Sequence, residues 1–318
     1  MAILKFSFPW RFLTLLCLSG LIILVGNLVI SPSLAQRSTP PVIMAAGDIA
    51  CAPDSAFFNG GKGKDGKCQM QATAQLVIQG KPQAVLALGD NQYEKGELEN
   101  FKQSYDPTWG KFKKITKPVP GNHEYYGGKQ AAGYYDYFGS LAGDRKKGYY
   151  SFDLGDWHLI ALNSNCKFVG GCEAGSPQET WLKADLKANK KACTLAFWHH
   201  PRYSSAVHGN NPGMEAFWQD LYGAGAELVL SGHDHDYERF APQGLNGKLD
   251  AKRGIRQFVV GNGGKSLYSF KTIRANSEVR NNDTYGVLKL TLKPKGYDWE
   301  MQSIPGSDFT DKGSALCH

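Results

Sequence analysis

Apolar runs that end in glycine followed by a polar residue recur along this chain, and they constrain the fold more than any other feature. In the clearest case, the apolar run Ala84–Leu88 has the length of a buried strand, stops at Gly89 and is followed by Asp90. Glycine permits a sharp turn, so the carboxylate can lie in a crevice just beyond the carboxyl end of the strand. The pattern therefore predicts a sheet of an α/β fold with a chemical site along one edge, where open α/β sheets bind their ligands.

Four further strand-like runs are followed by polar residues, three of them after a glycine. They deliver, in chain order, Asp48, Asn122 with His123, His199 with His200, and His233 with His235. Strands are expected over 42–46, 84–88, 118–120, 149–153, 157–162, 194–198, 227–230, 257–260, 285–293 and 297–303. Helices are expected over 69–79, 97–105, 177–189 and 211–222. Strands alternate with helices in the first part of the chain, and the last part consists mainly of strands. This order indicates a layered α/β fold.

The first 35 residues have the pattern of a secretory signal peptide. Lys5 and Arg11 precede an apolar run over 12–30, and small residues stand at the −3 and −1 positions of a cleavage site after Ala35. We therefore divide the chain into a signal peptide (1–35), a linker (36–41) and one α/β domain (42–318), and expect a secreted or periplasmic protein. Because the apolar run is long enough to span a bilayer, an uncleaved membrane anchor through 12–30 is the alternative.

Charge and cysteine content fit an exported protein. Without Lys5 and Arg11 the formal net charge falls from +7 to +5, a mild excess that helps to attract anionic substrates but is too scattered to indicate nucleic acid. Six of the seven cysteines follow the signal peptide, and an even number in an exported chain indicates disulfides. Many pairings are open; proximity favours Cys51–Cys68, Cys166–Cys172 and Cys193–Cys317. None of these cysteines has the spacing of a zinc finger.

The side chains at the strand ends form a mixed oxygen and nitrogen ligand set. Carboxylate, imidazole, amide and phenol groups suit borderline and hard transition metals, and the lack of a thiolate argues against a soft-metal site. The set is too large for one ion, but two ions that share the carboxylate of Asp90 would use all of it. Paired metals about 3.5 to 4 Å apart commonly hydrolyse phosphate esters. Each motif alone could be a turn or a solvated loop, yet five in one chain argue against that interpretation.

Five motifs in a fixed order carry a family resemblance. They are Gly47-Asp48, 89–93 (GDNQY), 121–124 (GNHE), 199–201 (HHP) and 232–239 (GHDHDYER). This set resembles the calcineurin-like metallophosphoesterases, and most closely their purple acid phosphatase branch. Most of that superfamily has a histidine where this chain has Ala50, whereas the purple acid phosphatases have a tyrosine at the position of Tyr93. The resemblance implies a layered α/β/β/α metallophosphoesterase sandwich in a single domain.

The resemblance also implies a ligand set for each of two metal ions. The first ion would take Asp48, Asp90, Tyr93 and His235, and the second would take Asp90, Asn122, His199 and His233. A tyrosinate is a hard anionic ligand that prefers ferric iron, so the resemblance implies Fe(III) in the first site and Zn, Mn or Fe in the second. Asp234 and Asp236 make the last motif more acidic than is usual in the family.

Together these features predict a secreted, dinuclear metal-dependent phosphatase that hydrolyses small-molecule phosphomonoesters. We expect in-line attack by a metal-bound hydroxide, with His123 as general acid and His200 and His208 as contacts of the substrate phosphate. A phosphodiesterase acting on nucleotides or phospholipid headgroups is the alternative, and a non-catalytic extracellular protein that binds metal or phosphate is a third interpretation. Neither nucleic acid nor, after signal cleavage, a membrane is expected as a partner, and the oligomeric state is left open.

Overall fold

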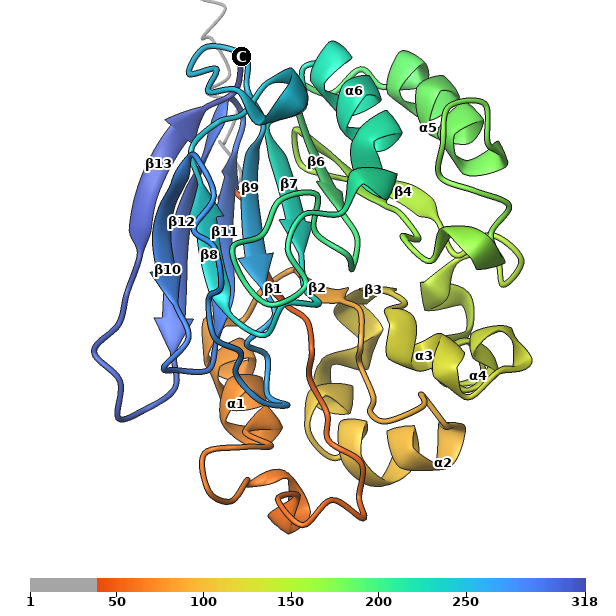
Figure 1. Cartoon of the computed structure of the whole chain (residues 1–318), viewed down its shortest axis with the longest axis vertical. Helices are drawn as coiled ribbons and strands as arrows, with labels where there is room; N and C mark the ends of the chain where they lie inside the picture. Colours follow the sequence, from red (N-terminus) through yellow and green to blue (C-terminus); the bar gives the residue numbers. More distant parts are fainter. Residues whose placement is uncertain (1–38) are drawn as a thin grey trace, which may run out of the picture. The chain divides into compact units, whose positions relative to one another are not determined.

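Two mixed β-sheets form the centre of the computed structural model, which describes residues 39–318 (Figure 1). The predicted signal peptide (1–35) and the first half of the predicted linker (36–41) therefore lie outside the described residues. The first sheet has the order β13-β12-β11-β1-β2-β3 and the second the order β10-β8-β9-β7-β6-β5-β4. The strands of the first sheet are β1 (Val42–Ala46), β2 (Ala84–Leu88), β3 (Thr116–Val119), β11 (Gly286–Lys293), β12 (Gly296–Ser303) and β13 (Lys312–Leu316). Those of the second are β4 (Tyr150–Leu154), β5 (Trp157–Ala161), β6 (Cys193–Phe197), β7 (Leu228–Ser231), β8 (Tyr237–Phe240), β9 (Arg256–Val260) and β10 (Ser277–Asn281).

The α-helices lie outside the sheets (Figure 1). They are α1 (Met70–Gly80), α2 (Leu98–Asn100), α3 (Asn122–Tyr126), α4 (Ala132–Phe138), α5 (Pro177–Ala188) and α6 (Glu215–Gly223). Helix α1 packs on β11 of the first sheet, and α5 packs beside α6. Helix α5 begins as the sequence indicates, because the Ser176 hydroxyl accepts a hydrogen bond from the backbone N–H of Glu179 at 3.3 Å.

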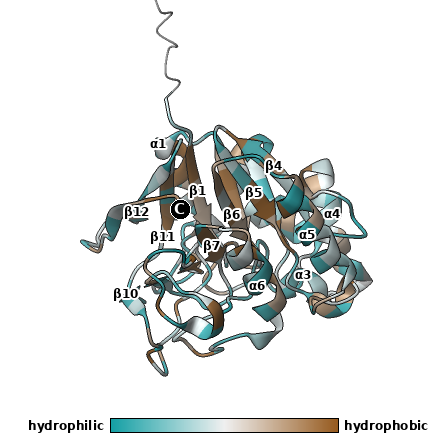
Figure 2. Ribbon diagram, turned by 90° about the horizontal axis from the view of Figure 1, so that it is seen from above, coloured by the Kyte–Doolittle hydropathy of each residue, from teal (hydrophilic) through white to brown (hydrophobic). Residues whose placement is uncertain are grey.

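The two faces of the second sheet pack on different layers, as neighbouring residues of its strands show. Ala196 and Val229 belong to an apolar cluster with Phe217 of α6, whereas their neighbours Leu195 and Leu228 belong to the core shared with the first sheet. Successive side chains of a strand point to opposite faces, so one face packs on helices and the other on the opposite sheet. Figure 2 shows the strands as the most hydrophobic elements. The α/β/β/α sandwich predicted from the sequence is confirmed.

The carboxyl ends of parallel strands from both sheets meet at one edge. Strands β1, β2 and β3 are parallel to one another, and so are β5, β6, β7 and β9. The backbone N–H of Gly47, after β1, donates to the carbonyl of Val260 at the end of β9 at 2.8 Å. This bond joins the two sheets where the polar residues of the motifs emerge. The edge predicted from the sequence is therefore shared by both sheets.

Three disulfides connect the cysteines as proximity in the sequence suggested. They are Cys51–Cys68, Cys166–Cys172 and Cys193–Cys317, so the predicted pairing is confirmed. Disulfides of this kind are typical of chains that fold in an oxidising compartment. Across residues 39–318, none of the helices combines the length and the apolar composition that a bilayer crossing requires.

Candidate metal centre

The phenol of Tyr93 lies at the centre of the ligands predicted for the first ion. Its hydroxyl oxygen is 2.9 Å from Oδ1 of Asp48 and 3.1 Å from Oδ2 of Asp90. The same oxygen is 2.9 Å from Nε2 of His235, and that nitrogen is 3.3 Å from Oδ1 of Asp48. All four side chains are buried. Residues from the ends of β1, β2 and β7 thus converge as the motifs predicted.

The ligands predicted for the second ion meet around Nε2 of His199. This nitrogen is 3.0 Å from Oδ1 of Asn122 and 3.3 Å from Oδ2 of Asp90. Nδ1 of His233 lies 3.2 Å from it. Asp90 therefore lies between the two sets, which is the position required of a carboxylate that two ions share.

Additional hydrogen bonds orient these side chains. Nδ1 of His199 donates to the backbone carbonyl of Leu88 at 2.9 Å, and because a carbonyl only accepts, Nε2 is the nitrogen left free for a ligand. The amide Nδ2 of Asn122 donates to the hydroxyl of Tyr126 at 2.9 Å, so the amide oxygen faces His199. Each potential ligand atom is thus directed inward by a contact on its far side.

The backbone at three of these residues adopts the left-handed conformation that non-glycine residues avoid. The φ angles are 59° at Asp48, 46° at Asp90 and 72° at His233. Such conformations cost about 1 kcal/mol or more each and are concentrated at functional sites. The turns after β1, β2 and β7 therefore share a strained backbone conformation. This conformation directs the side chains of Asp48, Asp90 and His233 toward the edge where the two sheets meet.

A metal cation fits among these side chains. They present more hydrogen-bond acceptors than there are protons to share between them. The Tyr93 hydroxyl has one proton, yet Asp48, Asp90 and His235 each place an oxygen or nitrogen within 3.1 Å of it. Ligand atoms of Asp48, Asp90 and His199 also lie within 4.8 Å of one another. Buried carboxylates are normally paired with cations or metals. The residues present match the oxygen and nitrogen ligands of hard and borderline metals.

Mutual interactions fix the charge of Asp90 and His199. Burial alone would raise the pKa of Asp90, but the imidazoles of His199, His123 and His233 hold it well below its ordinary value. Burial alone would lower the pKa of His199, but the carboxylates of Asp90 and Asp48 outweigh it and raise this pKa to about 9. Asp90 is therefore an anion at neutral pH, as a bridging ligand must be.

His123 lies beside the predicted ligands and is held at two points. Its backbone N–H donates to Oδ1 of Asp90 at 2.8 Å, and its Nδ1 donates to the carbonyl of Glu94 at 2.6 Å. Nε2 is 3.9 Å from Oδ2 of Asp90, and the side chain is 21% exposed. The ring thus offers Nε2 to the site from a partly open position.

His200 and His208 flank the ring of His233. The centroid of His200 is 4.4 Å from that of His233, and the centroid of His208 is 4.1 Å from it. Nδ1 of His200 lies 2.8 Å from the hydroxyl of Ser164, and burial lowers the pKa of His200 to about 3, which keeps it neutral. His208 is the more exposed of the two, and its Nδ1 lies 2.7 Å from Oδ1 of Asp234.

Residues 39–237, more than half of the chain, match the family described as calcineurin-like phosphoesterase. The chain belongs to this family. Its relatives include phosphatases of the branch that the Tyr93 position suggested.

The relatives are distant, and they are longer than this chain. Purple acid phosphatase 15 of Arabidopsis thaliana is 29% identical over 228 residues, which are 60% of this chain and 42% of that protein. Acid phosphatase type 7 of Mus musculus is 28% identical over 255 residues, 67% of this chain and 55% of that protein. The structure of a purple acid phosphatase from yellow lupin seeds has the same fold, with a TM-score of 0.73 and 20% identity over 88% of this chain and 54% of the lupin chain. The chain spans about half the length of the curated relatives it matches.

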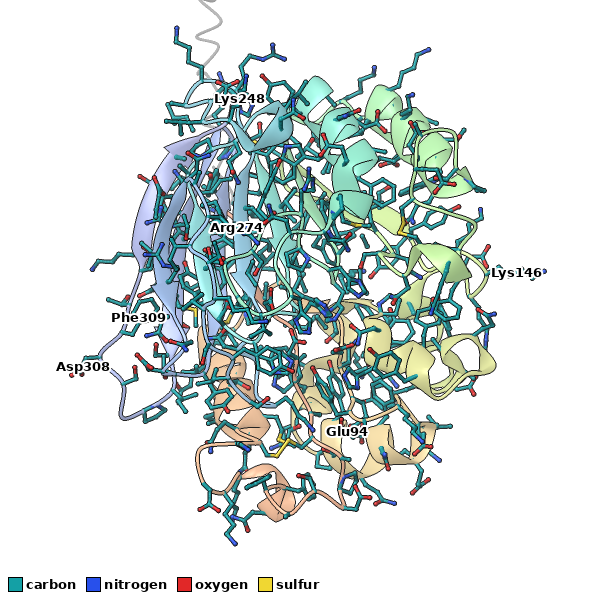
Figure 3. All side chains as sticks on the ribbon, in the orientation of Figure 1. Glu94, Lys146, Lys248, Arg274, Asp308 and Phe309 are labelled. Atoms are coloured by element: carbon teal, nitrogen blue, oxygen red, sulfur yellow. A yellow bond between two sulfur atoms is a disulfide. The ribbon has the colours of Figure 1, made fainter. Side chains whose placement is uncertain are left out.

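The sequence analysis did not identify the segment after β9 as part of the site. The hydroxyl of Ser266 is 2.9 Å from Nδ1 of His235, and the ring of Tyr268 stacks on His235 with centroids 3.8 Å apart. Nζ of Lys265 lies 4.7 Å from the ring centroid of Tyr93 and pairs with Glu94, which Figure 3 labels. A signal was present, because the strand 256–260 also ends in glycine followed by asparagine.

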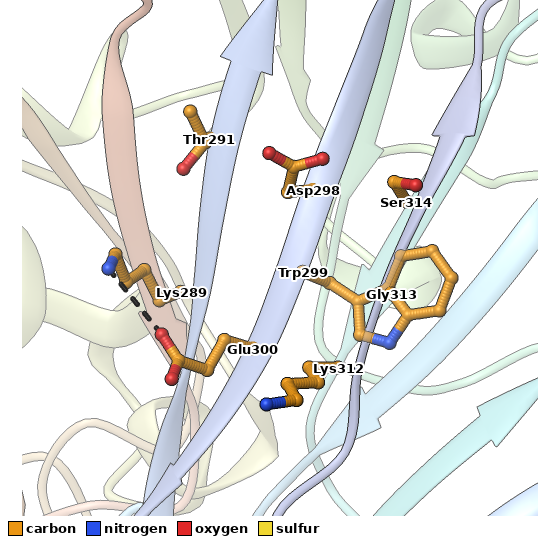
Figure 4. A pocket seen from close by; sticks show the side chains of 8 residues that line it. All are labelled: Lys289, Thr291, Asp298, Trp299, Glu300, Lys312, Gly313 and Ser314. Carbon is orange, nitrogen blue, oxygen red and sulfur yellow. Dashed lines mark hydrogen bonds and ion pairs between the residues drawn. The ribbon is translucent and has the colours of Figure 1, made fainter.

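A hollow on the outer face of β11, β12 and β13 is separate from the candidate metal centre (Figure 4). It has a volume of about 440 Å³ and none of its lining residues belongs to the five motifs. Lys289 and Glu300 form an ion pair of 3.4 Å across it, and Lys312 lies on the neighbouring strand. These side chains are the ordinary solvated charges of an exposed sheet face.

Proposed function

We propose that this chain is an exported phosphatase that hydrolyses phosphomonoesters at a dinuclear metal centre. The observation that carries the proposal is the convergence of Asp48, Asp90, Tyr93 and His235 beside the second set around His199. Membership of the calcineurin-like phosphoesterase family supports hydrolysis of phosphate esters. When bound, a pair of cations supplies Lewis acidity toward the phosphoryl oxygens and a nucleophile from water near neutral pH.

The environment of Tyr93 supports ferric iron in the first site, with Zn, Mn or Fe in the second. Burial and then the carboxylates of Asp48 and Asp90 raise the pKa of Tyr93 well above its ordinary value. A phenol in such a place ionises only beside a strongly charged cation, and a tyrosinate is a hard ligand that prefers Fe(III). A visible absorption band from tyrosinate bound to iron is the expected sign, and a colourless active protein would exclude iron there.

The geometry of His123 supports a role as general acid. Because Nδ1 donates to the carbonyl of Glu94, the ring acts as an acid only as imidazolium, and the proton at Nε2 is then the one available to a leaving alkoxide. The same contact and the backbone bond to Asp90 keep the ring from turning away. A positioned proton donor contributes roughly a hundredfold or more to such reactions.

Turnover of His123→Ala on two esters tests this role. We expect kcat for an alkyl phosphate to fall roughly a hundredfold, because an alkoxide needs a proton to leave. The fall should be much smaller with p-nitrophenyl phosphate, whose leaving group is stable as an anion. Metal content should stay at the wild-type value, and His318→Ala, at the other end of the sheets, serves as the matched control. Wild-type kcat on the alkyl ester would refute the assignment.

Rates on a monoester and a diester test the proposed substrate class. Comparison of p-nitrophenyl phosphate with bis-p-nitrophenyl phosphate separates a phosphomonoesterase from a phosphodiesterase, since one dinuclear centre can serve both reactions. We expect faster hydrolysis of the monoester. Faster hydrolysis of the diester would favour the alternative, and metal binding without any turnover would leave only a binding function.

A further inference from the structure

Asp234 lies between two predicted metal ligands, but its side chain points to a different part of the chain. Its Oδ1 accepts hydrogen bonds from Nδ1 of His208 at 2.7 Å and from the backbone N–H of His208 at 3.1 Å. Its Oδ2 accepts a hydrogen bond from the hydroxyl of Ser204. Asp234 is fully buried. A buried carboxylate with these partners ties the segment 204–208 to the motif that carries His233 and His235.

The contact with Asp234 determines which nitrogen of His208 is available. A carboxylate only accepts, so Nδ1 of His208 carries a proton and Nε2 is the nitrogen at the open side of the ring. The His208 ring overlies that of His233 at 4.1 Å with an angle of 33° between their planes, and its centroid is 5.7 Å from that of Tyr268. The side chain of His208 is 44% exposed. Nε2 is therefore accessible beside a predicted ligand of the second ion.

Other contacts already anchor the segment that carries His208. The backbone N–H of Ser205 donates to Oε2 of Glu238 at 2.8 Å, and that of Ser204 donates to Oδ1 of Asn210 at 3.1 Å. From the other side, Nε of Arg274, labelled in Figure 3, donates to the carbonyl of Ser204 at 3.0 Å. Asp234 adds three hydrogen bonds to this segment, and the one that orients the His208 ring is the bond to Nδ1.

We propose that Asp234 is a positioning residue of the substrate site, which holds His208 over His233 so that Nε2 meets the phosphoryl group of a bound ester. The inference rests on the proposed function. A carboxylate behind an imidazole fixes the orientation of the ring, as the outer partners of metal-bound histidines do. Held in this way, the imidazolium form of His208 donates its Nε2–H to the phosphoryl oxygens equally in the bound ester and during the reaction, so its contribution belongs to binding.

A double-mutant cycle tests the coupling of the two residues. Loss of a hydrogen bond to a charged group should raise KM for p-nitrophenyl phosphate roughly tenfold in Asp234→Ala and in His208→Ala, with little change in kcat. The double variant should be no worse than either single variant, because both remove one interaction. Glu238→Gln, which alters the neighbouring anchor without touching His208, should keep the wild-type KM. Additive losses, or an unchanged KM in folded Asp234→Ala, would overturn the proposal.

Two readouts keep this test separate from the test of catalysis. Nitrogen-15 spectra of histidine-labelled protein should show a proton on Nδ1 of His208 in the wild type and a loss of that fixed form in Asp234→Ala, or in Asp234→Asn if the alanine variant does not fold. The inhibition constant or affinity of orthophosphate should change in parallel with KM. If the wild type hydrolyses no ester, the proposed function fails, while these two readouts still decide the role of Asp234. An unchanged His208 spectrum in the variants would overturn it.

Discussion

At the scale of single residues, two glycines of the motifs lie where a Cβ would displace a predicted ligand. A Cβ on Gly121 would come 2.1 Å from Oδ1 of Asp90, and one on Gly89 would come 2.6 Å from Nδ1 of His199. Gly89 also has a φ of +87°, a conformation that side chains disfavour. The glycines in these motifs are therefore part of the site geometry, since they let the backbone approach the ligands closely.

The substitution Gly121→Ala should disrupt the centre. Its Cβ must push Asp90 away, and because that carboxylate belongs to both predicted ligand sets, affinity for both ions should fall at least roughly tenfold. Gly223→Ala on α6 is the matched control, because a Cβ there meets no atom within 4 Å. Metal affinity is measured by titration of both variants. Equal affinity in Gly121→Ala and wild type would contradict the assigned role of Asp90.

The sequence allowed the predicted ligands to be named, but not the residues that support them. Strand ends fix where Asp48, Asp90 and His199 emerge, so their convergence follows from the parallel order of the strands. The hydrogen bond between His208 and Asp234 depends on how the loop after β6 folds back over the site. Loop conformation has no periodic signal in a sequence, which is why such contacts need a structure.

At the scale of secondary structure, the prediction was accurate for most apolar strands, but it missed the buried strand β8 and two polar edge strands. The buried strands β2, β5 and β6 were predicted with boundaries within one residue. The strands β10 and β13, at the edges of their sheets, were missed because their residues (SEVRN and KGSAL) do not alternate between apolar and polar. The helix expected over 97–105 is α2 continued by a π-helical turn, Phe101–Tyr105.

His158 joins the β4–β5 hairpin to helix α5. Its Nδ1 is 2.8 Å from Oδ1 of Asp153 on β4, and its Nε2 is 2.8 Å from Oδ2 of Asp185 on α5. Burial alone lowers the pKa of His158, but the carboxylates of Asp185 and Asp153 outweigh it and raise this pKa above its ordinary value. This buried histidine is thus paired with two carboxylates of neighbouring elements.

The substitution His158→Gln should therefore destabilise the protein in a pH-dependent way. Because the pKa is raised on folding, the charged contribution is fully present below the unfolded pKa of about 6.5 and is lost as pH rises through the folded value. We expect a loss of about 1 to 3 kcal/mol in the free energy of unfolding at about pH 5.5, and a smaller loss at about pH 9. Urea unfolding of both proteins at the two pH values measures this difference. An equal loss at both would show that His158 acts only as a neutral hydrogen-bonding group.

At the scale of the whole molecule, two sheets and three disulfides support the edge on which the predicted ligands gather. Strands β1 and β2 carry Asp48 and Asp90 from the first sheet, while β6 and β7 carry His199 and His233 from the second. A centre built from both sheets requires their stacking to be fixed. Cys193–Cys317 contributes to this, because it ties β6 to the segment after β13 and so links the two sheets covalently.

Metal titration of the chelator-treated protein tests the central claim most directly. Calorimetric titration of the folded chain should reach two metal ions per molecule, and Asp90→Ala should weaken both binding events because its carboxylate belongs to both ligand sets. Binding of two ions with loss of both in the variant is the result that a shared bridging carboxylate predicts. A chain that binds no ion, or one ion that Asp90→Ala leaves unaffected, would contradict it.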